Sequence, residues 1–287
     1  MLKTGDIRIE EISRTYQSRG AGVHALGPVS VVLEAGKTTA IVGPSGCGKS
    51  TLLRIIGGLD RPTSGRVLLG GEVVREGTTG IGVVFQRDLL LDWRNVLDNV
   101  LLPAQLQRLD LTKARRRAML LLQELGVGDF ADRQPWELSG GMRQRVAIAR
   151  ALLCEPAFLL MDEPFSALDA LTRDQMGVLL QRVQGGGQTT SVLITHSIPE
   201  AVFLSDRVLV MSGRPGVLLD DIAIDLPRPR ALAMREEPSF TALTRRIRMH
   251  FERTGVLTGL AIPPPCPLPQ RRRHPAAPGV LASSCRF

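Results

Sequence analysis

The chain of 287 residues is poor in several residue types and in long apolar runs. These scarcities exclude some classes of protein. It holds one tyrosine, two tryptophans and four cysteines. The cysteines show neither a metal-binding spacing nor the density of a disulfide framework, so we expect free thiols in a reducing compartment. No apolar run reaches the roughly 18 residues that a membrane span needs, and the segment Met1 to Asp6 has no apolar signal core. We therefore expect a cytoplasmic protein whose membrane role, if it has one, comes through a partner.

The net charge of +8 is distributed unevenly. Residues 1–225 hold 25 basic and 25 acidic residues, whereas residues 226–287 hold 11 basic and three acidic ones. A basic fold would indicate a nucleic-acid partner, but the excess lies at the C-terminal end, so no nucleic-acid partner is expected. We expect a basic helix over residues 236–261 and a disordered tail rich in proline and arginine over residues 262–287.

One stretch carries the strongest chemical signal. It fits the pattern G-x-x-x-x-G-K-[S/T] between an apolar strand and an apolar helix, and its members are Gly43, Pro44, Ser45, Gly46, Cys47, Gly48, Lys49, Ser50 and Thr51. Glycines let backbone N–H groups point inward at a phosphate. Lys49 is expected to reach the β- and γ-phosphates and Ser50 to hold Mg²⁺. The chain is therefore predicted to bind a nucleoside triphosphate.

A phosphate loop needs further polar groups, and two strand ends supply them. Asp162 ends a continuous apolar run and is expected to hold Mg²⁺ through water. Glu163 follows it and is the candidate base that polarises the attacking water. His196 ends the next apolar strand, where a ring nitrogen can contact the γ-phosphate. Ser197 is the expected N-cap of the following helix, with Glu200 as its capping-box partner.

A second anion site is predicted from three residues that open a helix: Ser139, Gly140 and Gly141. Ser139 lies 23 residues before Asp162. One phosphate loop already surrounds a triphosphate within its own chain. The second site is therefore best used on a nucleotide bound by another copy, which implies a head-to-tail dimer with two-fold symmetry.

Six motifs in this order resemble the ATP-binding-cassette ATPase subunits of membrane transporters. They are Gly43 to Thr51 (Walker A), Gln86 (Q-loop), Leu138 to Met142 (signature), Leu159 to Glu163 (Walker B), Ser166 to Asp169 (D-loop) and His196 (switch histidine). The resemblance covers about residues 5–225. It implies that Tyr16, expected in a polar loop, stacks on the adenine of ATP. It also implies that Gln86 contacts Mg²⁺ and couples the nucleotide site to a permease, and that Asp169 belongs to the nucleotide site.

The resemblance and the pattern of elements together predict the fold class. It is α/β, a P-loop NTPase (RecA-like) core with an N-terminal antiparallel β subdomain and an inserted α-helical subdomain. The expected ATPase domain spans residues 1–235, with the helical insertion at about residues 88–156. Buried strands are expected at 37–42, 81–85, 157–161, 190–195 and 207–211, and a basic helix at Phe240 to Phe251.

Some longer stretches narrow the resemblance to the nitrate/sulfonate/taurine importer group. They are Val84 to Trp93 with Val96 to Val100, Met161 to Arg173, and Met211 to Gly216. That group usually has glycine where Ser166 stands and aspartate where Ser197 stands. The resemblance implies integral membrane permease subunits and a solute-binding protein as partners, and a place at the cytoplasmic face of the cell membrane. It leaves the transported solute open.

Two other functions fit the sequence less well. A regulatory GTPase is disfavoured because the chain lacks the guanine-reading N-K-x-D motif, and because such a protein would leave the Ser139 site unexplained. A cassette protein that acts on DNA or ribosomes usually carries two cassettes or a long coiled coil, and neither pattern is present in this sequence.

Overall fold

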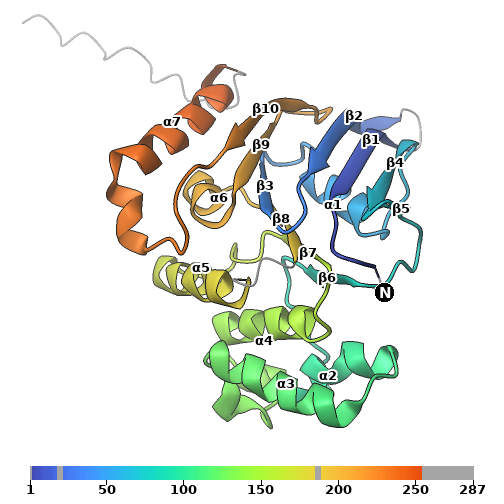
Figure 1. Cartoon of the computed structure of the whole chain (residues 1–287), viewed down its shortest axis with the longest axis vertical. Coiled ribbons are helices and arrows are strands. Elements are labelled where there is room, and N and C mark those ends of the chain that lie inside the picture. The colour runs from blue at the N-terminus through green and yellow to red at the C-terminus, as the bar shows by residue number, and fades with distance from the viewer. Residues whose placement is uncertain (1, 18–21, 185–188, 254–287) are drawn as a thin grey trace, which may run out of the picture.

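The computed structural model describes residues 2–17, 22–184 and 189–253. The end of the expected basic helix and the expected tail at 262–287 lie outside these ranges. The described strands form two sheets (Figure 1). The smaller, N-terminal sheet has the strand order β2 (Val23–Leu33), β1 (Ile7–Tyr16), β4 (Ser64–Leu69) and β5 (Glu72–Val73). The larger sheet has the order β10 (Leu218–Ala223), β9 (Arg207–Met211), β3 (Thr38–Val42), β8 (Thr190–Ile194), β7 (Phe158–Asp162) and β6 (Ile81–Val84).

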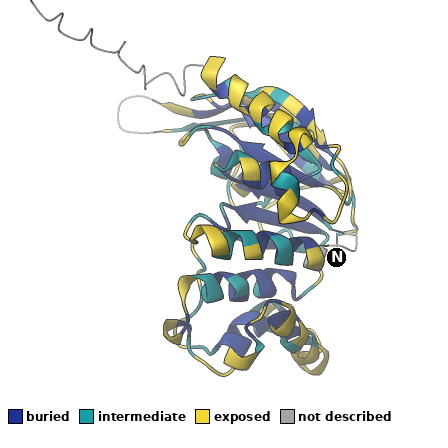
Figure 2. Ribbon diagram, turned by 90° about the vertical axis from the view of Figure 1, so that its left-hand side faces the viewer, coloured by how far each residue is buried: buried dark blue, intermediate teal, exposed yellow. Residues whose placement is uncertain are grey.

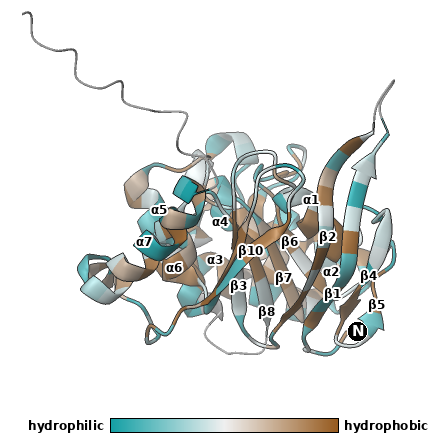
Figure 3. Cartoon of the chain, turned by 90° about the horizontal axis from the view of Figure 1, so that it is seen from above, coloured by the Kyte–Doolittle hydropathy of each residue, from teal (hydrophilic) through white to brown (hydrophobic). Residues whose placement is uncertain are grey.

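The larger sheet is parallel from β9 to β6, and β10 joins its edge antiparallel to β9. Every residue of β3, β7 and β8 is buried. This explains why these strands read as unbroken apolar runs rather than as alternating ones. Figure 3 shows the hydrophobic strands in the middle of the molecule, with α5 (Ala170–Gln184) and α7 (Pro238–Arg253) to one side. The parallel order brings the C-terminal ends of β3, β7 and β8 to one edge.

The N-terminal sheet is antiparallel, as expected. Its first strand is longer than predicted and ends at Tyr16, so the prediction that Tyr16 lies in a polar loop is wrong. The cross-strand pairing of Tyr16 with Val23 extends the ladder beyond the apolar residues that the pattern identified. Helix α1 (Lys49–Ile56) lies between the two sheets and shares one apolar core with both.

Three helices stand between β6 and β7 in the chain: α2 (Val96–Leu106), α3 (Leu111–Glu124) and α4 (Gly140–Leu152). They form the lower part of the molecule, with buried inner faces and exposed outer ones (Figure 2). Their buried side chains belong to the same core as those of β7, α5 and α6 (Ile198–Leu204), so this helical layer packs on the sheet without a break. The short 3₁₀ turns Gly128–Phe130 and Pro135–Glu137 connect α3 to α4.

After β10, the C-terminal segment packs against α5 and α6 and continues through the 3₁₀ turn η3 (Leu232–Glu236) into α7. The helix predicted from Phe240 to Phe251 is confirmed within α7. Asp220 on β10 pairs with His250 at 2.8 Å and with Arg246 at 3.3 Å. Part of the basic character of this helix therefore serves its docking onto the sheet edge.

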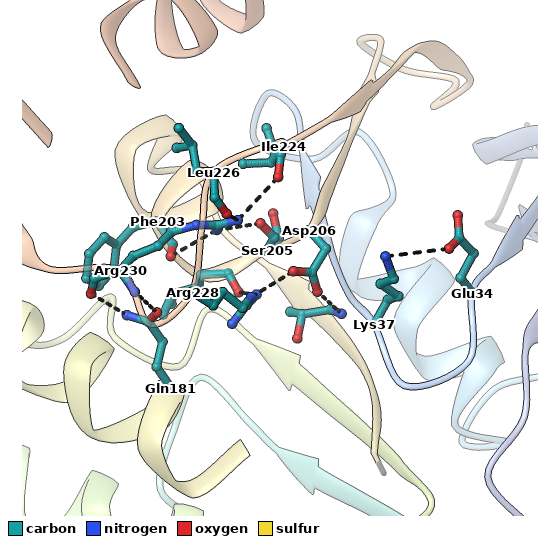
Figure 4. Close-up of polar contacts among 12 residues, drawn as sticks. Glu34, Lys37, Gln181, Phe203, Ser205, Asp206, Ile224, Leu226, Arg228 and Arg230 are labelled. Atoms are coloured by element: carbon teal, nitrogen blue, oxygen red, sulfur yellow. Dashed lines mark hydrogen bonds and ion pairs between the residues drawn. The ribbon is translucent and has the colours of Figure 1, made fainter. Parts of the chain in front are cut away.

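Arg230 anchors this segment, and no motif marked it in the sequence. Its guanidinium is buried and donates to five backbone oxygens at 2.6–3.3 Å (Figure 4). These carbonyls belong to Val202, Phe203, Ser205, Ile224 and Leu226. Three of them lie in or just after the last turn of α6, where a cation complements the helix dipole. Burial lowers the pKa of Arg230 to about 10, so the side chain stays charged near neutral pH.

Candidate active site

The loop between β3 and α1 carries the predicted phosphate-binding glycines and lysine. Gly48 caps α1 with a φ of 102°, and a Cβ at this position would lie 2.6 Å from the carbonyl oxygen of Ala25. Only glycine fits such a position. The Lys49 ammonium is buried and donates to the carbonyl oxygens of Gly43 at 2.9 Å and Pro44 at 3.0 Å. The predicted phosphate-binding lysine therefore already lies across the loop that it is expected to serve.

Ser50 and Asp162 meet although 112 positions separate them. The Ser50 hydroxyl donates to Asp162 Oδ1 at 2.8 Å. Burial raises the pKa of the Asp162 carboxyl above its usual range, and the Ser50 hydrogen bond partly opposes this rise. A buried carboxylate beside a hydroxyl supplies the oxygen ligands that Mg²⁺ takes in nucleotide sites. Asp162 and Ser50 thus fit the predicted metal site.

Glu163 brings two other predicted residues together. Gln86 Nε2 donates to Glu163 Oε2 at 3.3 Å, and His196 Nδ1 lies 3.3 Å from the same oxygen. Glu163 has a φ of 46°, in the left-handed region that non-glycine residues rarely adopt. Strain of this kind often accompanies function. The arrangement gives a partly buried carboxylate, oriented by two nitrogen groups, at the strand edge beside Asp162.

The signature residues form a second group with the D-loop. Ser139 caps α4 by accepting from Met142 N at 3.3 Å. A Cβ on Gly141 would lie 2.9 Å from the Thr172 methyl group, which places the start of α4 against the first turn of α5. Asp169 caps that turn, and the hydrogen bonds from the Thr172 backbone and hydroxyl lower the pKa of Asp169. In Figure 1, β6 and β7 lie between α4 and α1.

Tyr16 is held by its neighbours rather than free on a loop. Its hydroxyl donates to Asp60 Oδ2 at 2.7 Å. The Arg14 guanidinium lies 4.5 Å from the ring centroid and also pairs with Asp60 Oδ1 at 2.8 Å. Arg14 thus covers one face of the half-buried ring, and Asp60 contacts both Arg14 and the Tyr16 hydroxyl. The predicted stacking of Tyr16 on adenine stays a prediction.

Comparison with known proteins identifies the family. A family model described as ABC transporter matches residues 26–166. The taurine import ATP-binding protein of Rhizobium johnstonii is 42% identical over 261 residues, which cover 89% of this chain and 100% of that protein. This chain belongs to the ABC transporter family. The predicted family and fold class are thereby confirmed, and this ABC subunit is an ATP-binding ATPase.

Other similar proteins include a bicarbonate transport ATP-binding protein of Synechocystis, 39% identical over 246 residues that cover 84% of this chain and 37% of that protein. Among solved structures, the dimeric structure of a bacterial ABC transporter cassette has a TM-score of 0.69 and 32% identity, covering 77% of this chain and 100% of that one. A post-hydrolysis state of the same cassette, bound to ADP and Pi, matches with the same TM-score of 0.69.

The sequence did not reveal the contacts that two residues near the ABC site make. Arg214 Nε donates to the Gly46 carbonyl oxygen at 3.3 Å, so the turn between β9 and β10 braces the phosphate loop from outside. The sequence includes Met211 to Gly216 among the family-like runs, but no local pattern indicates that this run contacts the phosphate loop.

Glu200 was expected to complete a capping box. Only half of that prediction holds: Ser197 accepts from Glu200 N at 3.4 Å, while the carboxylate is buried and bonded to Thr195.

Within residues 2–17, 22–184 and 189–253, no helix of this ABC subunit is long and apolar enough to cross a membrane.

Proposed function

We propose that this subunit powers the import of a small anionic or organosulfur solute of the taurine, sulfonate or nitrate type. The chain is 42% identical in sequence to a taurine import ATP-binding protein over that protein's full length, and this similarity supports the solute class. Integral membrane permease subunits, a solute-binding protein and a second copy of this chain are the proposed partners. The proposed location is the cytoplasmic face of the cell membrane. The observation that carries the hydrolytic part is the convergence of Gln86 and His196 on Glu163, beside the Ser50–Asp162 pair.

The roles of the site residues follow from their contacts. Lys49 exchanges its two carbonyl partners for the β- and γ-phosphates of ATP, to which a charged donor binds more strongly than to a neutral oxygen. Glu163 accepts a proton from the attacking water, and His196 and Gln86 hold the carboxylate in place. Mg²⁺, held by Ser50, Asp162 and Gln86, would neutralise charge on the phosphates when bound.

The other half of the site is proposed to come from a second chain. Ser139, Gly140 and Gly141 present a helix N-terminus with a serine cap, which suits the γ-phosphate of a nucleotide on the partner. Asp169 lies in the same group and is proposed to face the same interface. ATP then holds two chains together, hydrolysis releases them, and the Gln86 region passes the motion to the permease.

Reconstituted transport tests this function. The chain is co-expressed with the permease and the solute-binding protein encoded beside its gene, and the complex is placed in vesicles. We expect uptake that requires ATP and the binding protein, with taurine, an alkanesulfonate, nitrate or bicarbonate as solute. Parallel vesicles with Glu163→Gln serve as the control without turnover. Failure of the chain to associate with any permease, together with tight nucleic-acid binding, would contradict the proposal.

A further inference from the structure

Glu200 is a buried carboxylate at the junction of α6, α5 and η3. The proposed mechanism assigns it no role. Glu200 stands in the first turn of α6, and its side chain is 7% exposed. Its carboxylate interacts electrostatically with Arg173 on α5, Arg235 on η3 and Glu163 beyond β7, and accepts a hydrogen bond from the Thr195 hydroxyl at the end of β8. Residues of α5 and η3 and residues that follow β7 and β8 therefore influence one carboxylate.

The junction is incompletely hydrogen-bonded. Among the described residues, Glu200 Oε1, Arg173 Nε and Arg235 Nε are buried and have no hydrogen-bond partner. Buried polar atoms are nearly always paired, and each exception asks for an explanation. Glu200 thus has an unpaired acceptor oxygen, and the two arginines that influence it electrostatically each have an unpaired donor nitrogen. Hydrogen bonds between such charged groups are stronger than those between neutral groups.

The partners of this junction reach the catalytic machinery directly. Thr195 Oγ1 accepts from Ser197 N at 3.0 Å, so the Glu200–Thr195 contact fixes the turn that carries His196. Arg173 Nη2 donates to the Leu168 carbonyl oxygen at 2.9 Å, which fixes the D-loop just before Asp169. Arg235 pairs with Asp174 at 2.5 Å and covers the Phe203 ring at 4.6 Å. The C-terminal segment thus contacts both α5 and α6 at this junction.

We propose that Glu200 is a positioning residue for ATP hydrolysis, which links the His196 turn to the D-loop helix by pairing with Arg173 when the nucleotide site closes. This inference rests on the roles proposed above for His196 and Asp169. The link sets how His196 and the D-loop lie relative to one another, and it leaves the phosphate loop untouched. Loss of the Glu200 charge should therefore lower kcat and spare ATP affinity.

The titration of Glu200 provides an independent readout. Burial raises the pKa of Glu200 to about 7 from its ordinary value of 4.5. Between these two values the folded chain keeps a proton that the unfolded chain loses, so folding stability declines as pH rises through this window. Above about pH 7 the folded protein carries the buried charge, held there by Arg173 and Arg235 against burial and Glu163. Glu200→Gln removes that charge at nearly constant shape.

The test compares Glu200→Gln with Glu236→Gln, an exposed glutamate next to Arg235, in the full-length chain. We expect Glu200→Gln to lower kcat roughly tenfold at pH 8, the size of a lost charged contact, with KM unchanged and Tm equal or higher. The rise of kcat between pH 6 and pH 8 should disappear in this variant. Glu236→Gln should match the wild type.

A double-mutant cycle identifies the partner. Arg173→Gln should lower kcat at least as much as Glu200→Gln does, because it also removes the hydrogen bond to the Leu168 carbonyl oxygen. The double variant should be no worse than Arg173→Gln alone, because the Glu200–Arg173 link is then already lost. The proposal is overturned by an unchanged kcat and pH profile in Glu200→Gln, by a parallel fall of kcat and Tm, or by additive effects of the two substitutions. Failure of the proposed function is distinguishable, since Glu163→Gln would then leave hydrolysis intact.

Discussion

We expect Glu163→Gln to stop ATP turnover, to leave ATP binding intact and to trap the chain as an ATP-bound dimer. The amide keeps the shape of the side chain and its position near Gln86 and His196, but it cannot accept a proton from water. Removing a general base costs roughly 100-fold or more in rate. Phosphate release measures turnover, and size-exclusion chromatography with ATP measures the dimer.

The control for this variant is Glu155→Gln. Glu155 also has a positive φ, 49° against 46° for Glu163, so the two substitutions share any backbone cost. Glu155 pairs only with Arg117 at the surface among the described residues, and its variant should hydrolyse ATP at the wild-type rate. Brisk hydrolysis by Glu163→Gln would show that another group accepts the proton.

Lys49→Ala should lower ATP affinity by roughly 100-fold, because a phosphate in a partly buried loop is left without its cation. The ammonium reaches two loop carbonyls in the described structure, which shows that it can lie over the loop. The same substitution removes these two hydrogen bonds, so Tm is measured together with titration of a fluorescent ATP analogue.

The matched change is Lys37→Ala, which removes the same charge from an exposed position 3.9 Å from Glu34. Exposed ion pairs of this kind contribute little, so its affinity and Tm should stay at wild-type values. Equal affinities of the Lys49 and Lys37 variants would exclude Lys49 from the phosphate site.

The phosphate loop and the strand-end residues were predictable from the sequence. A strand, a glycine-rich loop and a helix are adjacent in the chain, so local pattern suffices for Lys49. The meeting of Ser50 with Asp162 follows from one rule, that parallel strands end at the same edge of a sheet. These contacts depend on the order of the strands more than on side-chain packing, so the sequence pattern was sufficient to predict them.

Contacts that depend on tertiary packing were missed. Tyr16 lies in a strand because β2 pairs with it, and the apolar pattern ended before that point. Glu200 matched the local capping pattern, but burial against α5 and η3 turned its carboxylate inward. Arg230 donates hydrogen bonds to five carbonyl oxygens that lie up to 28 positions away in the chain. No residue spacing in the sequence predicts such a site.

The central claim is that each ATP site combines the phosphate loop of one chain with the signature residues of another. It is tested by mixing Lys49→Ala with Ser139→Asp. Aspartate keeps the cap of α4 and repels the γ-phosphate, so each variant alone should be inactive. Mixed chains form heterodimers that hold one intact site, and ATP hydrolysis should recover to about a quarter of the wild-type rate. If both halves of the site came from one chain, heterodimers confirmed by differential tags would stay inactive, and that result would contradict the account.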